Sequence, residues 1–241
     1  MYYFWTVKVV RYIPIFFILT SIIAAYFYAG GNIHNPSQVG YSVTHNFLSD
    51  LGGYKSHSGK FNILSALLFN ISMIMFILVG ISFLFVPRLF RENKVNYFLS
   101  ILGSVFFLLG TIFFAGVGFT PYDLYLDMHV FFAINAFRFL IPASVLYFIV
   151  LLRSSISNKY AFTIILLFLF TFFYVVYQII SASPLESIES MVEQATIQKI
   201  IALINVVSIF ILSFAFEEQI RKLKLDSVSY THLTLPTILL V

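Results

Sequence analysis

Cysteine is absent from this chain of 241 residues, and charged side chains are scarce. Without cysteine the protein can form no disulfide, no thiolate metal site and no cysteine nucleophile. Charged residues make up 10% of the sequence, whereas soluble domains contain about 25%. The sequence also lacks HExxH, GxSxG and every glycine-rich phosphate-binding motif. These absences exclude an ordinary soluble domain and the commonest recognisable catalytic sites.

Six apolar runs of roughly 20 residues are the main feature that the sequence does contain. They extend over residues 12–29, 61–86, 97–118, 128–152, 160–181 and 197–216. A helix of this length spans the hydrocarbon core of a bilayer. We therefore predict an all-α fold, a polytopic membrane bundle of six transmembrane helices within residues 1–227. The first run is similar to a signal peptide, but it is long for one and no small-x-small cleavage site follows it.

Basic residues are divided unevenly among the predicted loops. One set of segments carries Lys8, Arg11, Arg88, Arg91, Lys94, Arg153, Lys159, Arg221, Lys222 and Lys224. The other set carries few basic residues and most of the acids. The positive-inside rule then predicts cytoplasmic termini and a long first loop outside. We expect the plasma membrane of a prokaryote. Because the net charge of +4 gathers at membrane boundaries, we expect membrane lipid and not nucleic acid as a partner.

The last residues of the chain require separate treatment. Residues 228–237 read VSYTHLTLPT. The codons GTC TCT TAT ACA CAT CTG ACG CTG CCG ACG encode this string and resemble the transposase end and adapter of sequencing libraries. We interpret residues 228–241 as an adapter scar and exclude them from the fold.

The segment TPYDLYLDMHVFFAINAFRFLIP, residues 120–142, contains both a helix-start pattern and a polar centre. Thr120 can cap a helix, Pro121 suits its first position, and Asp123 then falls in the first turn. His129 follows on a face of small residues, which predicts that it points toward protein rather than lipid.

Arg138 lies about ten residues past the expected membrane boundary, or about 15 Å along the same predicted helix. An arginine near the middle of a membrane costs at least ~2.5 kcal/mol. We therefore predict that its guanidinium faces protein or a cavity and bonds to amide, hydroxyl or carbonyl oxygens. Asn135 shares its face, and Pro142 cannot donate to the carbonyl of Arg138, so we expect a kink there.

Polar side chains recur at helical spacing within the other apolar runs. They are Asn62, Ser65 and Ser72 in the second run, Tyr174, Gln178 and Ser181 in the fifth, and Gln194, Gln198, Asn205 and Ser208 in the sixth. One interpretation is that these groups only form hydrogen bonds between helices. The other is that together they line an outward-facing polar cavity for a lipid headgroup or a small polar ligand.

The first outer loop contains THNFLSDLGG, residues 44–53. Thr44 can cap a short helix that Gly52 or Gly53 ends. We expect its polar residues to lie over the mouth of the bundle as a hydrogen-bonded cluster without a permanent metal or cofactor. The candidate ligand-binding residues are Arg138, His129, Asp123, Asp50, His45, Asn46, Ser49, Asn135, Gln178 and Gln198.

Two of these segments resemble a known family. NFLSDLG at 46–52, and F-T-P-x-D with a histidine six residues after the aspartate at 119–129, are similar to the membrane family catalogued as domain of unknown function 998. The resemblance extends over residues 8–220, and the layout is similar to DRAM and Frag-type six-helix proteins, some linked to lipid or lysosomal biology. That family has no established reaction, so the resemblance implies a fold and no particular activity.

Three functions are therefore considered. The first is a membrane protein that binds a lipid headgroup or a small polar ligand. The second is a structural or partner-binding protein without a ligand. The third is a metal-dependent, membrane-embedded hydrolase using Ser49, Asp50, His45 and His129. The hydrolase is disfavoured because the sequence lacks paired histidines on a late helix, so an enzyme is the less favoured reading.

Overall fold

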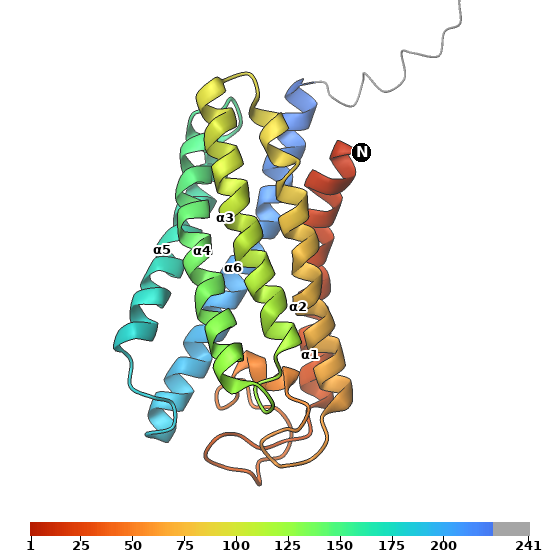
Figure 1. Ribbon diagram of the computed structural model, residues 1–241, viewed down its shortest axis with the longest axis vertical. Helices are drawn as coiled ribbons and strands as arrows, with labels where there is room; N and C mark the ends of the chain where they lie inside the picture. Colours follow the sequence, from red (N-terminus) through yellow and green to blue (C-terminus); the bar gives the residue numbers. More distant parts are fainter. Residues whose placement is uncertain (224–241) are drawn as a thin grey trace, which may run out of the picture.

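The computed structural model describes residues 1–223 and consists of six long helices (Figure 1). They are α1 (Val10–Phe27), α2 (Ile63–Phe83), α3 (Lys94–Phe119), α4 (Leu126–Leu152), α5 (Asn158–Ile180) and α6 (Ile188–Leu223). A π-helical turn, Phe4–Val9, precedes α1, and two short 3₁₀ helices cover Leu48–Gly52 and Val86–Phe90. All six are long and apolar enough to cross a membrane. The predicted all-α bundle is confirmed, and the chain is an integral membrane protein. The residues interpreted as adapter sequence lie outside the described part.

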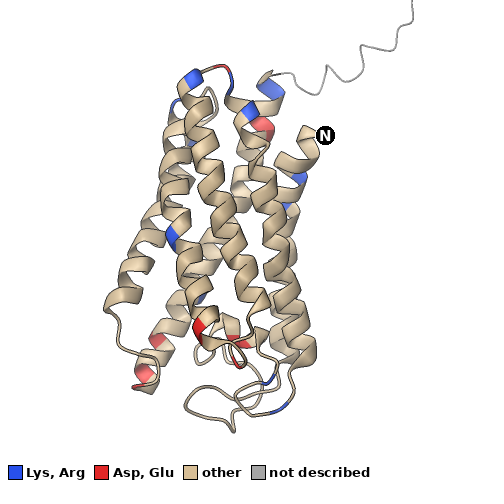
Figure 2. Ribbon diagram, viewed as in Figure 1, with Lys and Arg blue, Asp and Glu red and all other residues tan. Residues whose placement is uncertain are grey.

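The helices form a closed ring in which each packs against the one before it and α6 returns to α1. Figure 2 shows Lys and Arg gathered at the end that holds Met1, and most Asp and Glu at the opposite end. We call these the basic end and the loop end, because the long segment between α1 and α2 covers the second one (Figure 1).

Small residues let α3 and α4 approach closely. A side chain added at Gly110 would meet the Ala136 carbonyl at 3.3 Å, and one added at Gly103 would meet the Tyr147 ring at 3.0 Å. Glycines seven residues apart in α3 allow this close approach of the two helices. It fixes which face of α4 points inward.

The basic end of the bundle is filled by aromatic rings. Phe83 stacks on Phe107 with ring centroids 3.7 Å apart, and Tyr147 and Phe216 pack edge-on against Phe83. Arg11 closes the seam between α1 and α6 with an ion pair of 2.7 Å to Glu217. Because side chains pack closely at the basic end, the space for a ligand lies at the loop end.

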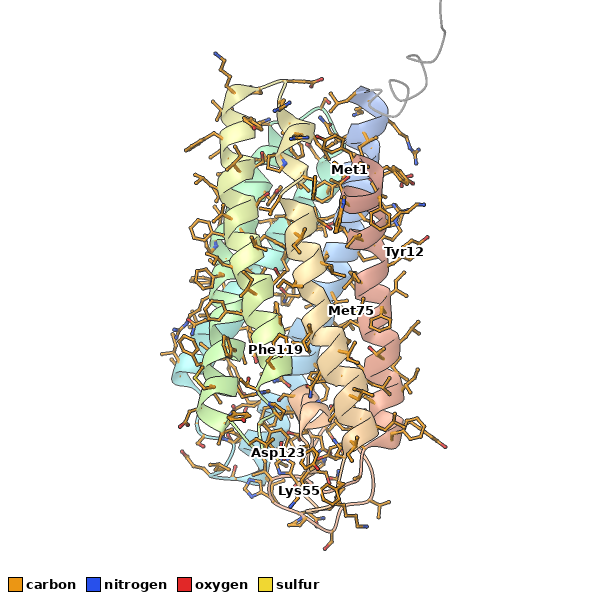
Figure 3. All side chains as sticks on the ribbon, turned by 45° about the vertical axis from the view of Figure 1, so that its right-hand side comes forward. Met1, Tyr12, Lys55, Met75, Phe119 and Asp123 are labelled. Carbon is orange, nitrogen blue, oxygen red and sulfur yellow. The ribbon has the colours of Figure 1, made fainter. Side chains whose placement is uncertain are left out.

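Two helix starts differ from the sequence prediction. Helix α4 begins at Leu126 rather than at Thr120, and Pro121–Leu124 form a turn before it. Asp123 is therefore not in the first turn of a helix: its carboxylate accepts the Tyr54 and Lys55 amides of the first loop, both at 2.8 Å. Figure 3 shows Asp123 beside Lys55 at the loop end. Two amide donors from the loop outweigh a weak attraction to a helix dipole.

The second difference concerns the first loop. No helix begins at Thr44; the short helix starts at Leu48 after Phe47, whose amide donates to Asp50 Oδ2 at 3.0 Å. This helix ends at Gly52 with Gly53 as its C-cap, in agreement with the prediction that Gly52 or Gly53 ends it. Helix α4 runs through Pro142 without a break, and the kink expected there stays a prediction.

Candidate functional site

The first loop, residues 28–62, is organised around the side chain of Asn46, which is 0% exposed. Its Oδ1 accepts from Gln38 Nε2 at 2.7 Å and from the Ser42 amide at 3.0 Å. Its Nδ2 donates to the Gly31 carbonyl at 2.8 Å and to Asp50 Oδ2 at 3.0 Å. One buried amide thus satisfies four groups from separate parts of the loop, so the loop has a defined shape without strands or long helices.

Polar residues of α2 and its N-cap residue Asn62 hold the LSDLG helix against the bundle. Asn62 Nδ2 donates to the carbonyls of Leu51 at 3.2 Å and Gly53 at 3.1 Å, Ser65 donates to Leu51, and Asn70 donates to Gly52 at 2.9 Å. The polar stripe predicted for this run therefore binds backbone, and it does not face a ligand cavity.

Helix α6 holds the same segment from the other side. Gln198 Oε1 accepts the Leu48 amide at 2.8 Å. The Lys199 ammonium donates to the Asn46 carbonyl and to the Ala195 carbonyl, the latter at 2.8 Å. NFLSDLG is thus a docking segment clamped between α2 and α6, and this clamp aims Ser49 and Asp50 at the interior.

His57 faces the buried carboxylate of Asp50 on the inner side of this loop. Its Nε2 lies 3.3 Å from Asp50 Oδ1, a distance that forms an ion pair when the ring is protonated. The His57 ring also stacks on Tyr122, with centroids 5.0 Å apart. The pair is brought together by Gly31, where the chain passes so close to His57 and Ser58 that no Cβ fits.

A cavity of about 740 Å³ lies between this loop and helices α4, α5 and α6. Its polar lining consists of Ser49, Asp50, His57, Tyr122, Asp127, His129, Tyr174, Tyr177, Gln178, Ser183, Gln194 and Gln198. The remaining lining is apolar and includes Phe47, Val130 and Ile134. His34 Nε2 reaches the Pro184 carbonyl at 2.9 Å and ties the first loop to the α5–α6 connection beside the cavity.

A smaller space of about 70 Å³ continues toward the centre of the bundle. Its walls are mostly apolar, with Phe17, Phe69, Phe76 and Phe114 among them. Ser49, His129, Ala133 and Gln198 line both spaces. The two spaces therefore adjoin at these residues, and we call the larger, mixed space the outer chamber and the smaller, apolar space the inner chamber.

His129 stands at the junction and is buried. Its Nδ1 lies 2.7 Å from the Thr120 carbonyl, which can only accept, so Nδ1 carries a proton. In the neutral ring Nε2 is then the acceptor available to the cavity. The prediction that His129 points toward protein is confirmed by its burial.

The charges around the outer chamber have one sign. Among the described lining residues there are two carboxylates, Asp50 and Asp127, and neither Lys nor Arg. Burial, with Asp50 as a second cause, raises the pKa of Tyr122 above its ordinary value. Its phenol therefore stays protonated and donates to the Lys55 carbonyl at 3.2 Å. The chamber offers carboxylates, amide and hydroxyl groups and aromatic rings, which suit a neutral or cationic group.

The candidate residues predicted from the sequence fall into two groups: some line the outer chamber, and others hold the first loop in place. Ser49, Asp50, His129, Gln178 and Gln198 line the outer chamber. Asn46 lies behind its wall, hydrogen-bonded to Asp50. His45 and Asp123 are not among its lining residues. His45 Nδ1 bonds to Thr44 Oγ1 at 2.8 Å in the first loop, and Asp123 holds that loop.

The position predicted for Arg138 is wrong. The residue is exposed on the outside of α4, and no hydrogen bond or ion pair of its guanidinium occurs within residues 1–223. Asn135 does not join a site either, since its Nδ2 donates to Phe131 of its own helix at 2.8 Å. The reason is the rotation of α4: Ala136 packs against Gly110, and a residue two positions later points about 200° away.

Sequence reasoning missed His57, Tyr122, Asp127 and Tyr177. His57 lies in a loop without periodicity, so no spacing relates it to Asp50. Tyr122 falls in the turn before α4, where the sequence predicts the start of the helix, and Asp127 lies in the first turn of α4 itself. In the described part of the chain, no three His, Asp or Glu side chains come close enough to hold a metal ion together.

Comparisons with known proteins add no relative to this picture. No model of a known family matches the chain, and neither does any curated protein or solved structure.

Proposed function

We propose that this membrane protein binds an amphiphile whose polar head occupies the outer chamber and whose apolar part enters the inner one. The observation that carries the proposal is the meeting of the two chambers at Ser49, His129, Ala133 and Gln198. A site with a mixed outer part and an apolar inner part matches a lipid-like molecule better than a small polar solute.

The lining also selects the class of head group. Asp50 and Asp127 repel an anionic phosphate unless a cation accompanies it, and no described lining residue is basic. Tyr122, Tyr174 and Tyr177 supply aromatic faces that attract ammonium groups. The head group that fits is therefore an amine or a hydroxyl-rich group. Arg138 plays no part in this binding, because it lies on the other side of α4.

The alternative without a ligand keeps some support, since Asn62, Ser65, Asn70 and Gln198 all bind backbone groups of the first loop. No observation on the described residues specifically favours the hydrolase alternative. The resemblance to domain of unknown function 998 remains a proposal that rests on the NFLSDLG and FTPxD segments, and it supports a six-helix fold rather than an activity.

Filling the junction is expected to expel the ligand. In Ala133→Phe the new ring occupies the place where the chambers meet, because Ala133 lines both. Native mass spectrometry of the purified protein should show a lipid adduct on the unaltered chain and at least a tenfold lower occupancy in the variant, or about 1.4 kcal/mol.

Val145→Phe is the matched control, because Val145 lies on the same helix and is 37% exposed away from both chambers. It should keep the adduct. Equal adducts in both variants would mean that the lipid sits on the outside of the bundle. A folded, unaltered protein without any adduct would favour the structural alternative.

We also propose that the basic end faces the cytoplasm of a prokaryotic plasma membrane, as the positive-inside rule predicts. The chain has no native cysteine, so single-cysteine labelling on intact cells tests the orientation. Val39→Cys in the first loop, where Val39 is 97% exposed, should react with an impermeant maleimide, and Glu92→Cys between α2 and α3 should react only after permeabilisation. The opposite labelling pattern would show that the basic end faces outward.

A further inference from the structure

Arg138 is a charge in the middle of a membrane-spanning helix that faces away from its own bundle. It lies twelve residues after the first residue of α4 and fourteen before the last, or about 18 and 21 Å along the axis. Its side chain is exposed, and no partner for its guanidinium occurs among the described residues. As a monomer in lipid, the chain would hold this charge in hydrocarbon at a cost of at least ~2.5 kcal/mol.

Lipid head groups are poorly placed to relieve that cost. The hydrocarbon core is about 30 Å thick, so a residue at its centre lies about 15 Å from either boundary. An arginine side chain snorkels over only part of that distance. A counter-charge at the same depth as Arg138 removes the cost more completely.

The surface around Arg138 has the form of a helix-docking stripe. Phe131, which is 51% exposed, and Val145 lie one heptad before and one heptad after it on the same face of α4. Pro142 has no N–H to give to the Arg138 carbonyl four residues earlier, so the same turn presents an unused acceptor beside five N–H donors. We call Phe131, Arg138 and Val145 the Arg138 stripe.

We propose that the Arg138 stripe binds a transmembrane helix of another protein that carries an Asp or Glu side chain near its midpoint. Charge complementarity demands an acid. A second copy of this chain does not supply one: nine of its ten Asp and Glu lie in loops or within two turns of a helix end, and Asp226 follows the described residues. The partner is therefore a different protein. This interface is independent of the ligand cavity.

A synthetic helix tests this interface directly. The full chain is reconstituted in phosphatidylcholine vesicles with a labelled Leu/Ala transmembrane peptide that has one central Glu, and energy transfer measures association. A matched peptide with Leu in place of the Glu is the first control. We expect the Glu peptide to bind at least tenfold more tightly than the Leu peptide. The preference should disappear in Arg138→Leu and survive in part in Arg138→Lys. It should persist in the control Phe173→Leu, because Phe173 is an exposed residue of a different helix, α5.

Three results would overturn the proposal. The first is equal binding of the two peptides to the unaltered chain. The second is a self-association of the chain that Arg138→Leu abolishes, which would make a second copy the occupant. The third is full displacement of the Glu peptide by phosphatidylglycerol, which would make a lipid phosphate the occupant. Because the peptide controls leave the protein unchanged, a folding defect in a variant does not obscure the comparison.

Discussion

Asn46→Ala is expected to unfold the first loop while the six helices remain assembled. The substitution leaves two donors, Gln38 Nε2 and the Ser42 amide, and two acceptors, the Gly31 carbonyl and Asp50, without their buried partner. Gln38 Nε2, the Gly31 carbonyl and Asp50 Oδ2 each keep one other partner, whereas the Ser42 amide loses the one it has among the described residues. A stranded donor costs about 1–3 kcal/mol, and each of the other lost bonds costs about 0.5–1.5 kcal/mol. Since the groups share one site and relax together, we expect a total loss of about 3 kcal/mol in the stability of the loop.

Hydrogen exchange followed by mass spectrometry measures this effect, because it resolves the loop from the helices. Amides in residues 28–62 should lose protection, whereas those in the basic half of α2 and α3 should keep it. Asn35→Ala is the control in the same loop: Asn35 is exposed, and its Oδ1 accepts only the Ser37 amide. A similar loss in both variants would show that Asn46 has no special role.

Gly31→Ala is the second substitution with a large expected effect. The φ of Gly31 is +82°, a value that side chains with a Cβ rarely adopt. An added Cβ would also collide with backbone, meeting the Ser58 amide nitrogen and lying 2.5 Å from the carbonyl carbon of His57. The chain must then separate at this crossing, which moves His57 away from Asp50. We expect a loss of several kcal/mol in loop stability, in the range of a cavity or backbone defect, together with loss of the lipid adduct.

Gly59→Ala separates the cost of the positive φ from the cost of the steric collision. Gly59 has a similar φ of +79°, but a Cβ there would have open space around it. It therefore carries the conformational cost alone, about 1 kcal/mol. Thermal unfolding and native mass spectrometry of the two variants should show a small shift with the adduct kept for Gly59→Ala, and a large shift with the adduct lost for Gly31→Ala. Equal shifts would mean that the crossing of Gly31 and His57 does not shape the site.

Helix α4 shows where local signals were insufficient. The pattern at Thr120, Pro121 and Asp123 suits a helix start, but Asp123 bonds to two amides of the first loop, about 70 residues earlier in the chain. The energetic argument that placed Arg138 inside the bundle was incomplete for a similar reason. The cost of a charge in hydrocarbon predicts that Arg138 needs a partner, but it does not say on which side of the helix that partner lies. The packing of Ala136 against Gly110 determines the rotation of α4 and turns Arg138 outward.

The sequence alone determined the number and approximate limits of the six helices, the absence of cysteine chemistry and the importance of the NFLSDLG segment. These properties follow from composition and from residue spacing within a few helical turns. The thickness of the bilayer and the need to satisfy backbone hydrogen bonds inside it require long apolar helices, which can be recognised from local sequence. The tertiary structure decided which polar residues meet: it paired His57 with Asp50, placed the two chambers side by side at His129 and separated Arg138 from both. Such pairs depend on helix rotation and on the course of a long loop, and both are determined by contacts between residues far apart in the chain.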